Sequence, residues 1–452
     1  MRVRVIEWVI GGLLALSCQV VQAAPAPAIP GARSCFWFNG PFSGDPYINA
    51  AYPDEYAFYW TAAFTVPAGA SLHLEGQFAH ARYQSFVTYN ALGQAVESVA
   101  DYRIDPLPGS VNPFRPGVDR RAARRSYRFG VTGKAQGLDT GDGRADAAPR
   151  SSINAPPTQD GYQSLIYRIY ANDRGPSITG AVPLPEAVVT LADGRELRGD
   201  AACDALTSRR PMLGRVEVLN TPAAQYHELR KGMAERPAGW PAKPQPEWHV
   251  QHTRPDTLSI FTGDHAGRTA RKGGDFYPNP DNRYLRSFVS TKLGEVLVLH
   301  GKAPVTPRTF AGDGPMGTGQ LRYWSLCANQ VMVNTRVTDC LYDEQVPLDA
   351  RGWYTIVASK AKDRPRNARP ECGVAWLELP ARGDGLGDDD LSLIIFRHML
   401  AAPDFPQALQ NLQDDAEIAP ELGEYLPSVT YAMVNAVETL FPCPLDRKTG
   451  TK

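Results

Sequence analysis

Three histidines in the middle of the chain have a type and spacing that could bind a metal. His249 and His252 stand three residues apart, and His265 follows them. Two imidazoles at that spacing converge on one metal ion when the segment is helical. The tryptophan, valine and proline around them favour extended or turn structure instead, and no acidic residue stands at a recognised ligand spacing. We therefore interpret these histidines as unliganded and expect no metal or other cofactor.

Two acidic, glycine-containing segments, residues 139–146 and 384–390, could offer oxygen ligands to calcium. Calcium needs many oxygen ligands, and neither segment matches the loop pattern of an EF-hand. Acidic turns exposed to solvent are the interpretation that we favour.

Local motifs for covalent catalysis are missing from the sequence. There is no G-x-S-x-G nucleophile motif and no glycine-rich phosphate loop after a strand. If the protein is an enzyme, its site is assembled by the fold from distant residues.

An arginine followed by a tyrosine begins a predicted strand in each half of the chain. In the first half, the turn-like residues 90–93 would fold the chain back so that Arg82 faces Asp101. In the second half, a turn near Gln330 would fold the chain back in the same way and place Arg322 opposite Asp339. Opposite charges across an antiparallel pair stabilise a hairpin, which explains both pairs as structure alone.

The same two motifs also provide a candidate ligand site. A guanidinium near a domain mouth could bind an anionic ligand group through its planar set of donors. The candidate ligand-binding residues are Arg82, Tyr83, Asp101, Arg322, Tyr323, Trp324 and Asp339.

The two Arg-Tyr motifs belong to an internal repeat, and the strands of that repeat must position them. Landmarks of the first half return in the same order in the second half, which indicates a duplication. In the first half they are Tyr52-Pro53-Asp54, Leu72 to Gly76, Arg82 to Phe86, Tyr127 to Val131 and Leu165 to Tyr170. Their counterparts are Asn279-Pro280-Asp281, Leu297 to Gly301, Arg322 to Leu326, Tyr354 to Ala358 and Leu393 to His398.

Each landmark is typical of a strand. From Tyr56 to Thr65, large apolar residues alternate with smaller or polar ones, which is the pattern of a strand between two layers. We interpret its aromatic residues as core rather than as a sugar-binding platform. The predicted fold is mainly β, with two tandem, related antiparallel domains of sandwich or jelly-roll type.

A chain of 452 residues is longer than one hydrophobic core normally supports, so we expect two domains. We expect a connector with a short helix from Thr221 to Met233, begun by Thr221 and Pro222. Apolar residues at helical spacing predict a helical tail packed on the second domain. The predicted boundaries are 1–23 for a signal peptide, 24–212 for the first domain, 213–275 for the connector, 276–403 for the second domain and 404–452 for the tail.

The Arg-Tyr-x-Ser motifs, Tyr52-Pro53-Asp54 and the segment from Phe396 to Leu400 resemble those of a group of exported bacterial proteins without an assigned function. The resemblance covers most of the mature chain. It implies export and a double β fold, and it supplies no catalytic residue.

The first residues predict export. Arg2 and Arg4 precede an apolar run, Trp8 to Leu16, that is too short to cross a bilayer, and cleavage is expected after Ala23. Lipid attachment at Cys18 is a minor alternative, because the residues before it form a poor lipobox. We expect a periplasmic or secreted protein without a transmembrane segment. Its 47 basic and 48 acidic residues provide no net field for nucleic acid.

Six cysteines remain after cleavage, and an even number in an exported chain favours disulfides. Cys35 and Cys203 would bracket the first domain. In the second half we expect Cys327 with Cys340 and Cys372 with Cys443, although four cysteines allow two other pairings.

Two functional classes follow from these observations. The favoured one is a non-catalytic binding or interaction protein with a groove for a small apolar or carbohydrate-like ligand between its domains. The alternative is a hydrolase or isomerase with carboxylates and histidine between the domains. A deep pocket with two perturbed titratable groups would favour the enzyme.

Overall fold

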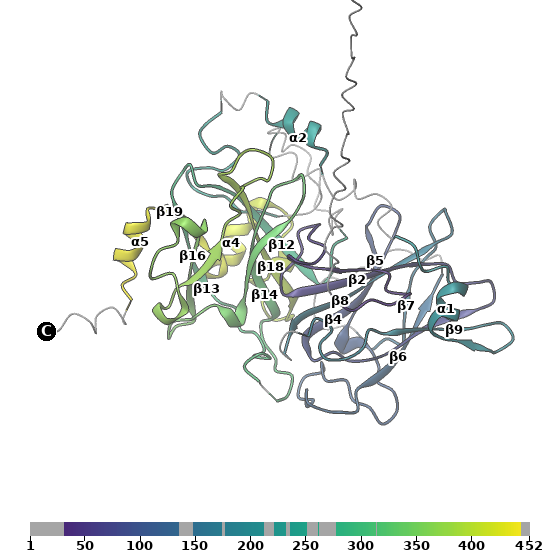
Figure 1. The fold of residues 1–452 in the computed structure, drawn as a ribbon. Coiled ribbons are helices and arrows are strands. Elements are labelled where there is room, and N and C mark those ends of the chain that lie inside the picture. The colour runs from purple at the N-terminus through teal and green to yellow at the C-terminus, as the bar shows by residue number, and fades with distance from the viewer. Residues whose placement is uncertain are drawn as a thin grey trace, which may run out of the picture.

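The computed structural model describes residues 31–134, 148–173, 177–211, 221–231, 236–250, 261, 277–312 and 314–443. The regular structure of the described chain is mainly β, and its strands form four sheets, two from each half of the sequence. Figure 1 shows the sheets side by side, with the sheets of the second half on the left and those of the first half on the right. The mainly β fold with two tandem domains is confirmed.

The first half forms an inner and an outer sheet. The inner sheet has the order β1-β2-β8-β4-β5, with strands β1 (Asn39–Phe42), β2 (Ala57–Phe64), β8 (Gln163–Asn172), β4 (Ala81–Tyr89) and β5 (Ala95–Ala100). The outer sheet has the order β10-β9-β3-β6-β7, with strands β10 (Glu196–Leu197), β9 (Glu186–Thr190), β3 (Ser71–Gln77), β6 (Ser126–Thr132) and β7 (Ser152–Asn154).

The second half repeats this arrangement. Its inner sheet has the order β11-β12-β18-β14-β15, with strands β11 (His249–Val250), β12 (Asn282–Ser290), β18 (Leu391–Ala401), β14 (Leu321–Asn329) and β15 (Val337–Tyr342). Its outer sheet has the order β17-β16-β13-β19, with strands β17 (Ala375–Glu378), β16 (Trp353–Ser359), β13 (Val296–Lys302) and β19 (Ser428–Ala432).

The predicted duplication is confirmed by this strand order. Read from the matching edge, β9-β3-β6-β7 and β19-β13-β16-β17 correspond strand for strand. The last pair is parallel in both outer sheets, and the other pairs are antiparallel. Leu72 lies opposite Val131, and Leu297 lies opposite Ala358, so the predicted match of the two leucines also holds. We call the two halves the first and second repeat.

Each repeat is a sandwich around its own core. In the first repeat, Phe86 of the inner sheet stacks on Phe129 of the outer sheet, with ring centroids 5.6 Å apart. In the second repeat, Trp324 stacks on Tyr354 at 5.3 Å. Strand alternation places one face of each strand in these cores. The aromatic residues of β2 were predicted to be core, and this is correct for Trp60 and Phe64, which are fully buried in the first repeat.

The two inner sheets are buried on both faces, because their other faces pack against each other. Strands β4 and β14 have no exposed residue. Tyr83 and Tyr170 of the first repeat and Tyr323 and Met399 of the second belong to one apolar cluster between the repeats. This contact between sheets makes the interface, rather than an open groove, the centre of the molecule.

The helices differ in part from the sequence prediction. The connector helix α2 spans Ala223–Leu229, inside the predicted range. The tail contains the short helices α4 (Ile418–Leu422) and α5 (Val434–Leu440), but β19 lies between them. Helical spacing did not predict this strand, which completes the second outer sheet as β9 does in the first. The second repeat therefore extends past residue 403, and β11 begins its inner sheet inside the predicted connector.

A further helix, α1 (Gly199–Ala205), closes the first repeat, and short 3-10 turns η1 (Asp101–Arg103) and η4 (Asp343–Gln345) follow β5 and β15. The remaining 3-10 turns are η5 (Ala361–Asp363), η6 (Pro370–Cys372), η7 (Leu409–Asn411), η8 (Asp415–Glu417) and η9 (Gly423–Tyr425). Among the described residues, no helix is long and apolar enough to cross a membrane.

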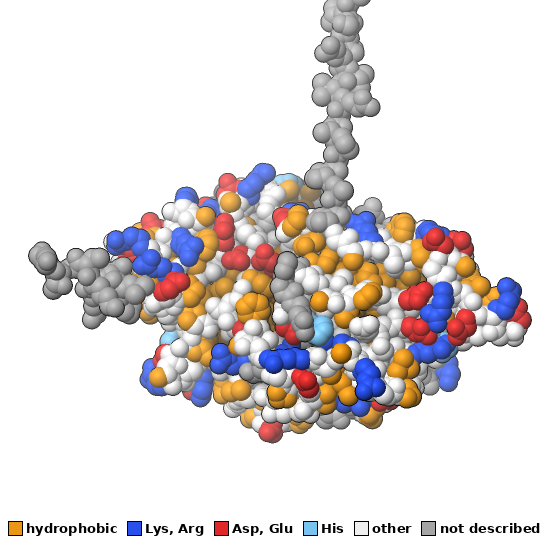
Figure 2. Space-filling view, turned by 60° about the horizontal axis from the view of Figure 1, so that its bottom comes forward, with side chains coloured by type: hydrophobic (Ala, Val, Ile, Leu, Met, Phe, Trp, Pro, Cys, Tyr) orange, Lys and Arg blue, Asp and Glu red, His pale blue; other side chains and the backbone are white. Residues whose placement is uncertain are grey.

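All three expected disulfides are present. They are Cys35–Cys203, Cys327–Cys340 and Cys372–Cys443. The first closes the first repeat onto α1, and the last ties the end of the tail to the second repeat. Figure 2 shows basic and acidic side chains interspersed over one face of the molecule.

Candidate functional site

The two arginines of the Arg-Tyr motifs form ion pairs across the interface between the repeats. Arg82 Nη1 lies 2.9 Å from Asp343 Oδ1, and its Nη2 pairs with Glu344. Arg322 Nη1 lies 3.2 Å from Asp101 Oδ1. Each arginine therefore pairs with a carboxylate of the other repeat, at the start of η4 or η1. Both guanidiniums are buried, which excludes them as ligand groups at an open mouth.

The predicted pairing within each hairpin is therefore wrong. In the first hairpin Ser85 lies opposite Ala100, a shift of two residues from the predicted register, and a bulge follows at Tyr89. In the second hairpin Ser325 lies opposite Tyr342, because the turn falls several residues later than predicted. Turn geometry sets hairpin register, and the longer turn was not visible in the sequence.

Asp339, the predicted partner of Arg322, lies on β15 opposite Ala328. It accepts a hydrogen bond of 2.7 Å from the backbone N–H of Glu378. Burial raises the pKa of Asp339 to about 6. The structural counterpart of Asp101 is Asp343, because the two carboxylates accept from the backbone N–H groups of Gln84 and Trp324 respectively.

The two tyrosines of the motifs also reach across the interface. Tyr83 donates to Asp281 Oδ2 at 2.5 Å, and Tyr323 donates to Asp54 Oδ2 at 2.9 Å. Ser325 donates to the same Asp54 oxygen at 2.6 Å. The aspartates belong to the two Tyr-Pro-Asp and Asn-Pro-Asp landmarks, so each landmark packs on the opposite repeat. Both tyrosine pKa values are raised well above 10 by burial.

A third crossed pair involves arginines in the middle of β8 and β18. Arg168 Nη2 donates to the backbone O of Tyr277 at 2.7 Å, and Arg397 Nη2 donates to the backbone O of Tyr52 at 2.8 Å. Arg168 and Arg397 are equivalent, because they lie opposite Ser85 and Ser325 respectively. Tyr52 and Tyr277 share a left-handed backbone, with φ of 50° and 52°.

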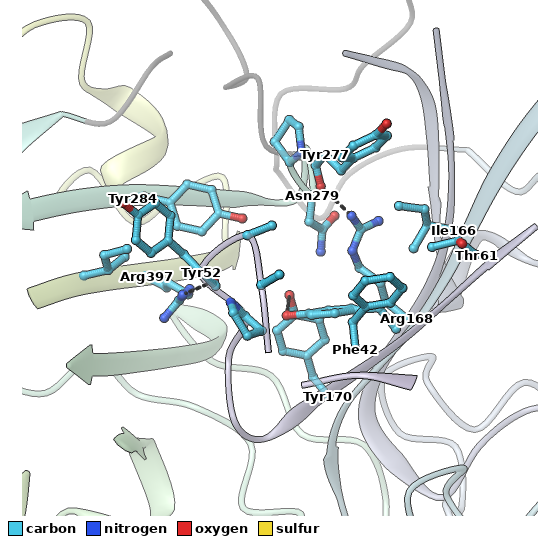
Figure 3. Close-up of a pocket in the computed structure, with 16 residues that line it drawn as sticks. Phe42, Tyr52, Thr61, Ile166, Arg168, Tyr170, Tyr277, Asn279, Tyr284 and Arg397 are labelled. Atoms are coloured by element: carbon cyan, nitrogen blue, oxygen red, sulfur yellow. Dashed lines mark hydrogen bonds between the residues drawn. The ribbon is translucent and has the colours of Figure 1, made fainter. Parts of the chain in front are cut away.

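A cavity of about 90 Å³ lies between the repeats at this third pair. It is lined from both sides by matching residues, as Figure 3 shows. The matching pairs are Tyr52 with Tyr277, Tyr59 with Tyr284, and Arg168 with Arg397. None of its lining residues in the described chain is a histidine or a carboxylate. We call it the inter-repeat pocket.

None of the seven predicted ligand residues lines the inter-repeat pocket. Five of them make the contacts across the interface between the repeats, namely Arg82, Tyr83, Asp101, Arg322 and Tyr323. Trp324 belongs to the core of the second repeat, where it stacks on Tyr354. The motifs therefore hold the two repeats together around the pocket.

A second and larger cavity, of about 400 Å³, lies beside the crossed pair of Arg82. Glu55, Tyr56, Phe310, Tyr342 and Glu344 are among its walls. Glu344 is already engaged by Arg82 and by the backbone N–H groups of residues 310 and 311. Burial, with Asp339 nearby, raises the pKa of Glu55 to about 7. Phe310 is 64 % exposed, so this cavity is a surface hollow.

The predicted metal and calcium candidates have other roles where the structure describes them. His249 Nδ1 lies 2.7 Å from Asp415 Oδ2, whereas His252 and His265 lie outside the described residues. Residues 139–146 also lie outside them.

The segment 384–390 is not a solvated turn, because two of its aspartates are buried. Arg230, just after α2, pairs with both Asp384 and Asp388, and Lys292 also binds Asp388 at 3.1 Å. The segment therefore anchors the connector helix to the second repeat.

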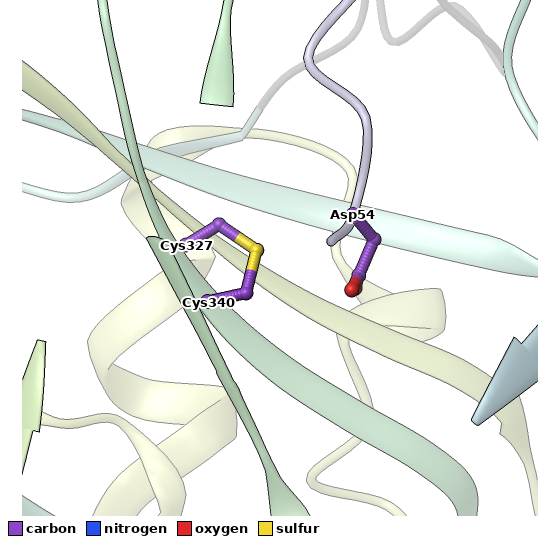
Figure 4. A group of neighbouring side chains, drawn as sticks. All are labelled: Asp54, Cys327 and Cys340. Carbon is purple, nitrogen blue, oxygen red and sulfur yellow. A yellow bond between two sulfur atoms is a disulfide. The ribbon is translucent and has the colours of Figure 1, made fainter. Parts of the chain in front are cut away.

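Asp54, Cys327 and Cys340 come close together in the interface, as Figure 4 shows. The two sulfurs form a disulfide and are not available as metal ligands. Asp54 instead accepts hydrogen bonds from Tyr323 and Ser325.

The sequence contained a signal for Arg168 and Arg397, the two arginines that line the pocket, but the predicted alignment of the two repeats did not match them. Arg168 and Arg397 are the charged residues within two otherwise apolar strand patterns. The predicted repeat matched Leu165 with Leu393, whereas the register matches Leu165 with Ile394. An offset of one residue moves every side chain to the opposite face, which hid the equivalence of the two arginines.

No protein-family model matches this chain, and no curated protein matches it. Two solved structures share a low overall likeness. An uncharacterised protein from Burkholderia cenocepacia is 13 % identical with a TM-score of 0.42, covering 86 % of this chain and 79 % of that one. The VPA0106 protein from Vibrio parahaemolyticus is 14 % identical with a TM-score of 0.37, covering 83 % of this chain and 89 % of that one.

Proposed function

We propose that this protein is an exported, non-catalytic binding protein that holds a small ligand in the inter-repeat pocket. The observation that carries the proposal is the pocket itself, which equivalent residues of both repeats line between two fully packed sandwiches. Pockets at domain interfaces, with walls made largely of apolar and aromatic residues and a few charged or amide groups, are the usual form of small-ligand sites.

Binding is favoured over catalysis because of the groups that face the pocket. Its described walls contain tyrosines and arginines but neither a histidine nor a carboxylate. Acid–base catalysis needs a group that exchanges protons near neutral pH, and tyrosine and arginine side chains do so poorly. Burial raises the pKa of the wall residue Tyr59 further, to about 12.

Export is supported by the three disulfides, which persist in oxidising compartments. The basic and apolar residues at the start of the sequence supply the targeting signal for either the periplasm or secretion.

The volume of the pocket limits the size of ligand that we propose. A cavity of about 90 Å³ suits a short organic group better than a whole sugar ring with its hydroxyls. We therefore favour a small or slender ligand over a carbohydrate.

The test is a thermal-shift screen with small-molecule probes on the mature, disulfide-bonded protein. Ala50 lines the pocket, so Ala50→Phe fills it, whereas Ala123→Phe adds the same ring to an exposed loop as the control. We expect at least one probe to raise the melting temperature of the native protein and the control but not of Ala50→Phe. A shift that survives in Ala50→Phe would place binding elsewhere, and turnover of a bound probe would favour the enzyme.

A further inference from the structure

Arg168 is a buried cation that forms no ion pair with a carboxylate of the described residues. The residue is 3 % exposed, and its Nη2 donates a hydrogen bond to the backbone O of Tyr277. A guanidinium has five N–H donors, two on each terminal nitrogen and one on Nε. Its Nη1 is buried without any partner among the described residues. Figure 3 shows the guanidinium at the pocket, beside Tyr277 and Asn279.

Two tyrosine rings cover the faces of this guanidinium. Its central carbon lies 5.4 Å from the ring centre of Tyr59 and 5.5 Å from that of Tyr89. Aromatic faces attract a cation but accept no strong hydrogen bond in the guanidinium plane. The Nη1 group, which has no hydrogen-bond partner among the described residues, therefore remains available to an acceptor in the pocket.

The equivalent Arg397 provides the comparison within the same pocket. Its Nη1 lies 3.9 Å from Asp54 Oδ2, so a carboxylate offsets its charge. The corresponding Asp281 of the second repeat instead accepts from Tyr83 and Ser98. Within the described part of the chain, Arg168 therefore lacks the close carboxylate that Arg397 has in Asp54. Burying a charge without such a partner costs free energy unless an anion neutralises it.

We propose that Arg168 binds the carboxylate of a small monoanionic ligand inside the inter-repeat pocket. The inference rests on the proposed binding function and names its ligand class. The single charge of this guanidinium matches a monoanion, and the planar fork of an arginine matches the two oxygens of a carboxylate. The tyrosine walls then contact a short apolar or aromatic chain.

Isothermal titration of the mature protein with propionate, butyrate and benzoate tests the proposal. Propionamide, which has nearly the same shape without the charge, is the matched probe. The variants are Arg168→Met, Arg168→Lys as a second variant that keeps the charge, and Arg195→Met as a control at an exposed arginine.

We expect a carboxylate to bind the native protein and Arg195→Met, with propionamide much weaker. Loss of charged hydrogen bonds predicts about 10–100-fold weaker binding to Arg168→Met. Arg168→Lys should lie between the two, because it retains the charge but not the fork. Without ligand, Arg168→Met should unfold at the same or a higher urea concentration than the native protein, since it removes a buried charge that lacks a close carboxylate.

The two proposals fail differently. Equal carboxylate binding to the native protein and Arg168→Met, or equal binding of propionamide, overturns the carboxylate proposal and leaves the pocket as a site for neutral ligands. A probe that binds the native protein but not Ala50→Phe supports the pocket in either case. Absence of binding by every probe in the thermal-shift screen overturns the proposed function as well.

Discussion

Replacing Arg82 tests whether the repeats are joined by crossed ion pairs. Arg82→Met leaves Asp343 and Glu344 buried without their cation and also removes the hydrogen bond to Thr309. Removing one partner of a buried pair costs about 3–5 kcal/mol. Because the arginine is fully buried and contacts two carboxylates, we expect an effect near the upper end of that range.

A double-mutant cycle separates the crossed arrangement from pairing within the hairpin. The single variants Arg82→Met, Asp343→Asn and Asp101→Asn and the two double variants with Arg82→Met are compared by urea unfolding, followed by tryptophan fluorescence. Direct contact predicts a coupling energy of about 2–3 kcal/mol between Arg82 and Asp343. The coupling between Arg82 and Asp101 should be smaller by more than about 1 kcal/mol, because Asp101 pairs with Arg322 instead.

The measurement needs a cooperative transition, so coincident unfolding by fluorescence and circular dichroism is the control. If Arg82→Met does not fold, Arg82→Lys serves in the same cycle, since it keeps the charge and loses the fork. A larger coupling with Asp101 than with Asp343 would refute the crossed arrangement.

Three further predictions concern pH, a disulfide and the dependence of one repeat on the other. Burial raises the pKa of Glu55 from 4.5 to about 7, so the folded state binds more protons than the unfolded state between these values. The free energy of unfolding should therefore fall as the pH rises through this window and level off above it, by about 1–2 kcal/mol after allowance for partial exposure. In urea unfolding at several pH values, the free energy of unfolding of Glu55→Gln should lack this decrease. If the variant shows the same pH dependence as the native protein, Glu55 is not its cause. Replacing both Cys372 and Cys443 by Ser should cost about 2–4 kcal/mol, measured by the same unfolding, because the bridge spans 71 residues; an unchanged midpoint would show that the bridge adds no stability. Residues 24–212 produced alone should lack native near-ultraviolet circular dichroism, because the inner sheet would expose the apolar cluster that packs on the second repeat; a stable, monomeric first repeat would be the contrary result.

Much of the architecture follows from the sequence because it depends on local pattern and order. Period-two alternation predicted strands such as β2, and five landmarks in one order predicted the duplication. Even cysteine number and position predicted Cys35–Cys203, and the remaining two bridges agree with the favoured pairing. A small error in the predicted strand register does not change these predictions, because they depend on whole segments rather than on single positions.

The site depends on single positions, and only the tertiary structure decided it. Each charged landmark pairs with the other repeat, as Arg82 does with Asp343, because the inner sheets pack face to face and exclude water. No local rule tells a chain whether an arginine meets its own hairpin or another domain. The same packing places Arg168 and Arg397 around one pocket and brings Arg82 to the backbone O of Arg322, 240 residues away in the sequence.

Register was the physical limit of prediction from the sequence. A one-residue offset between β8 and β18 hid the equivalence of Arg168 and Arg397, and a later turn in the second hairpin replaced Asp339 by Asp343. Side chains alternate between faces, so such small shifts change which groups meet without changing the fold. The sequence by itself determined the β class, the duplication and the bridges, whereas the packing of the two inner sheets determined which charged groups meet across the interface.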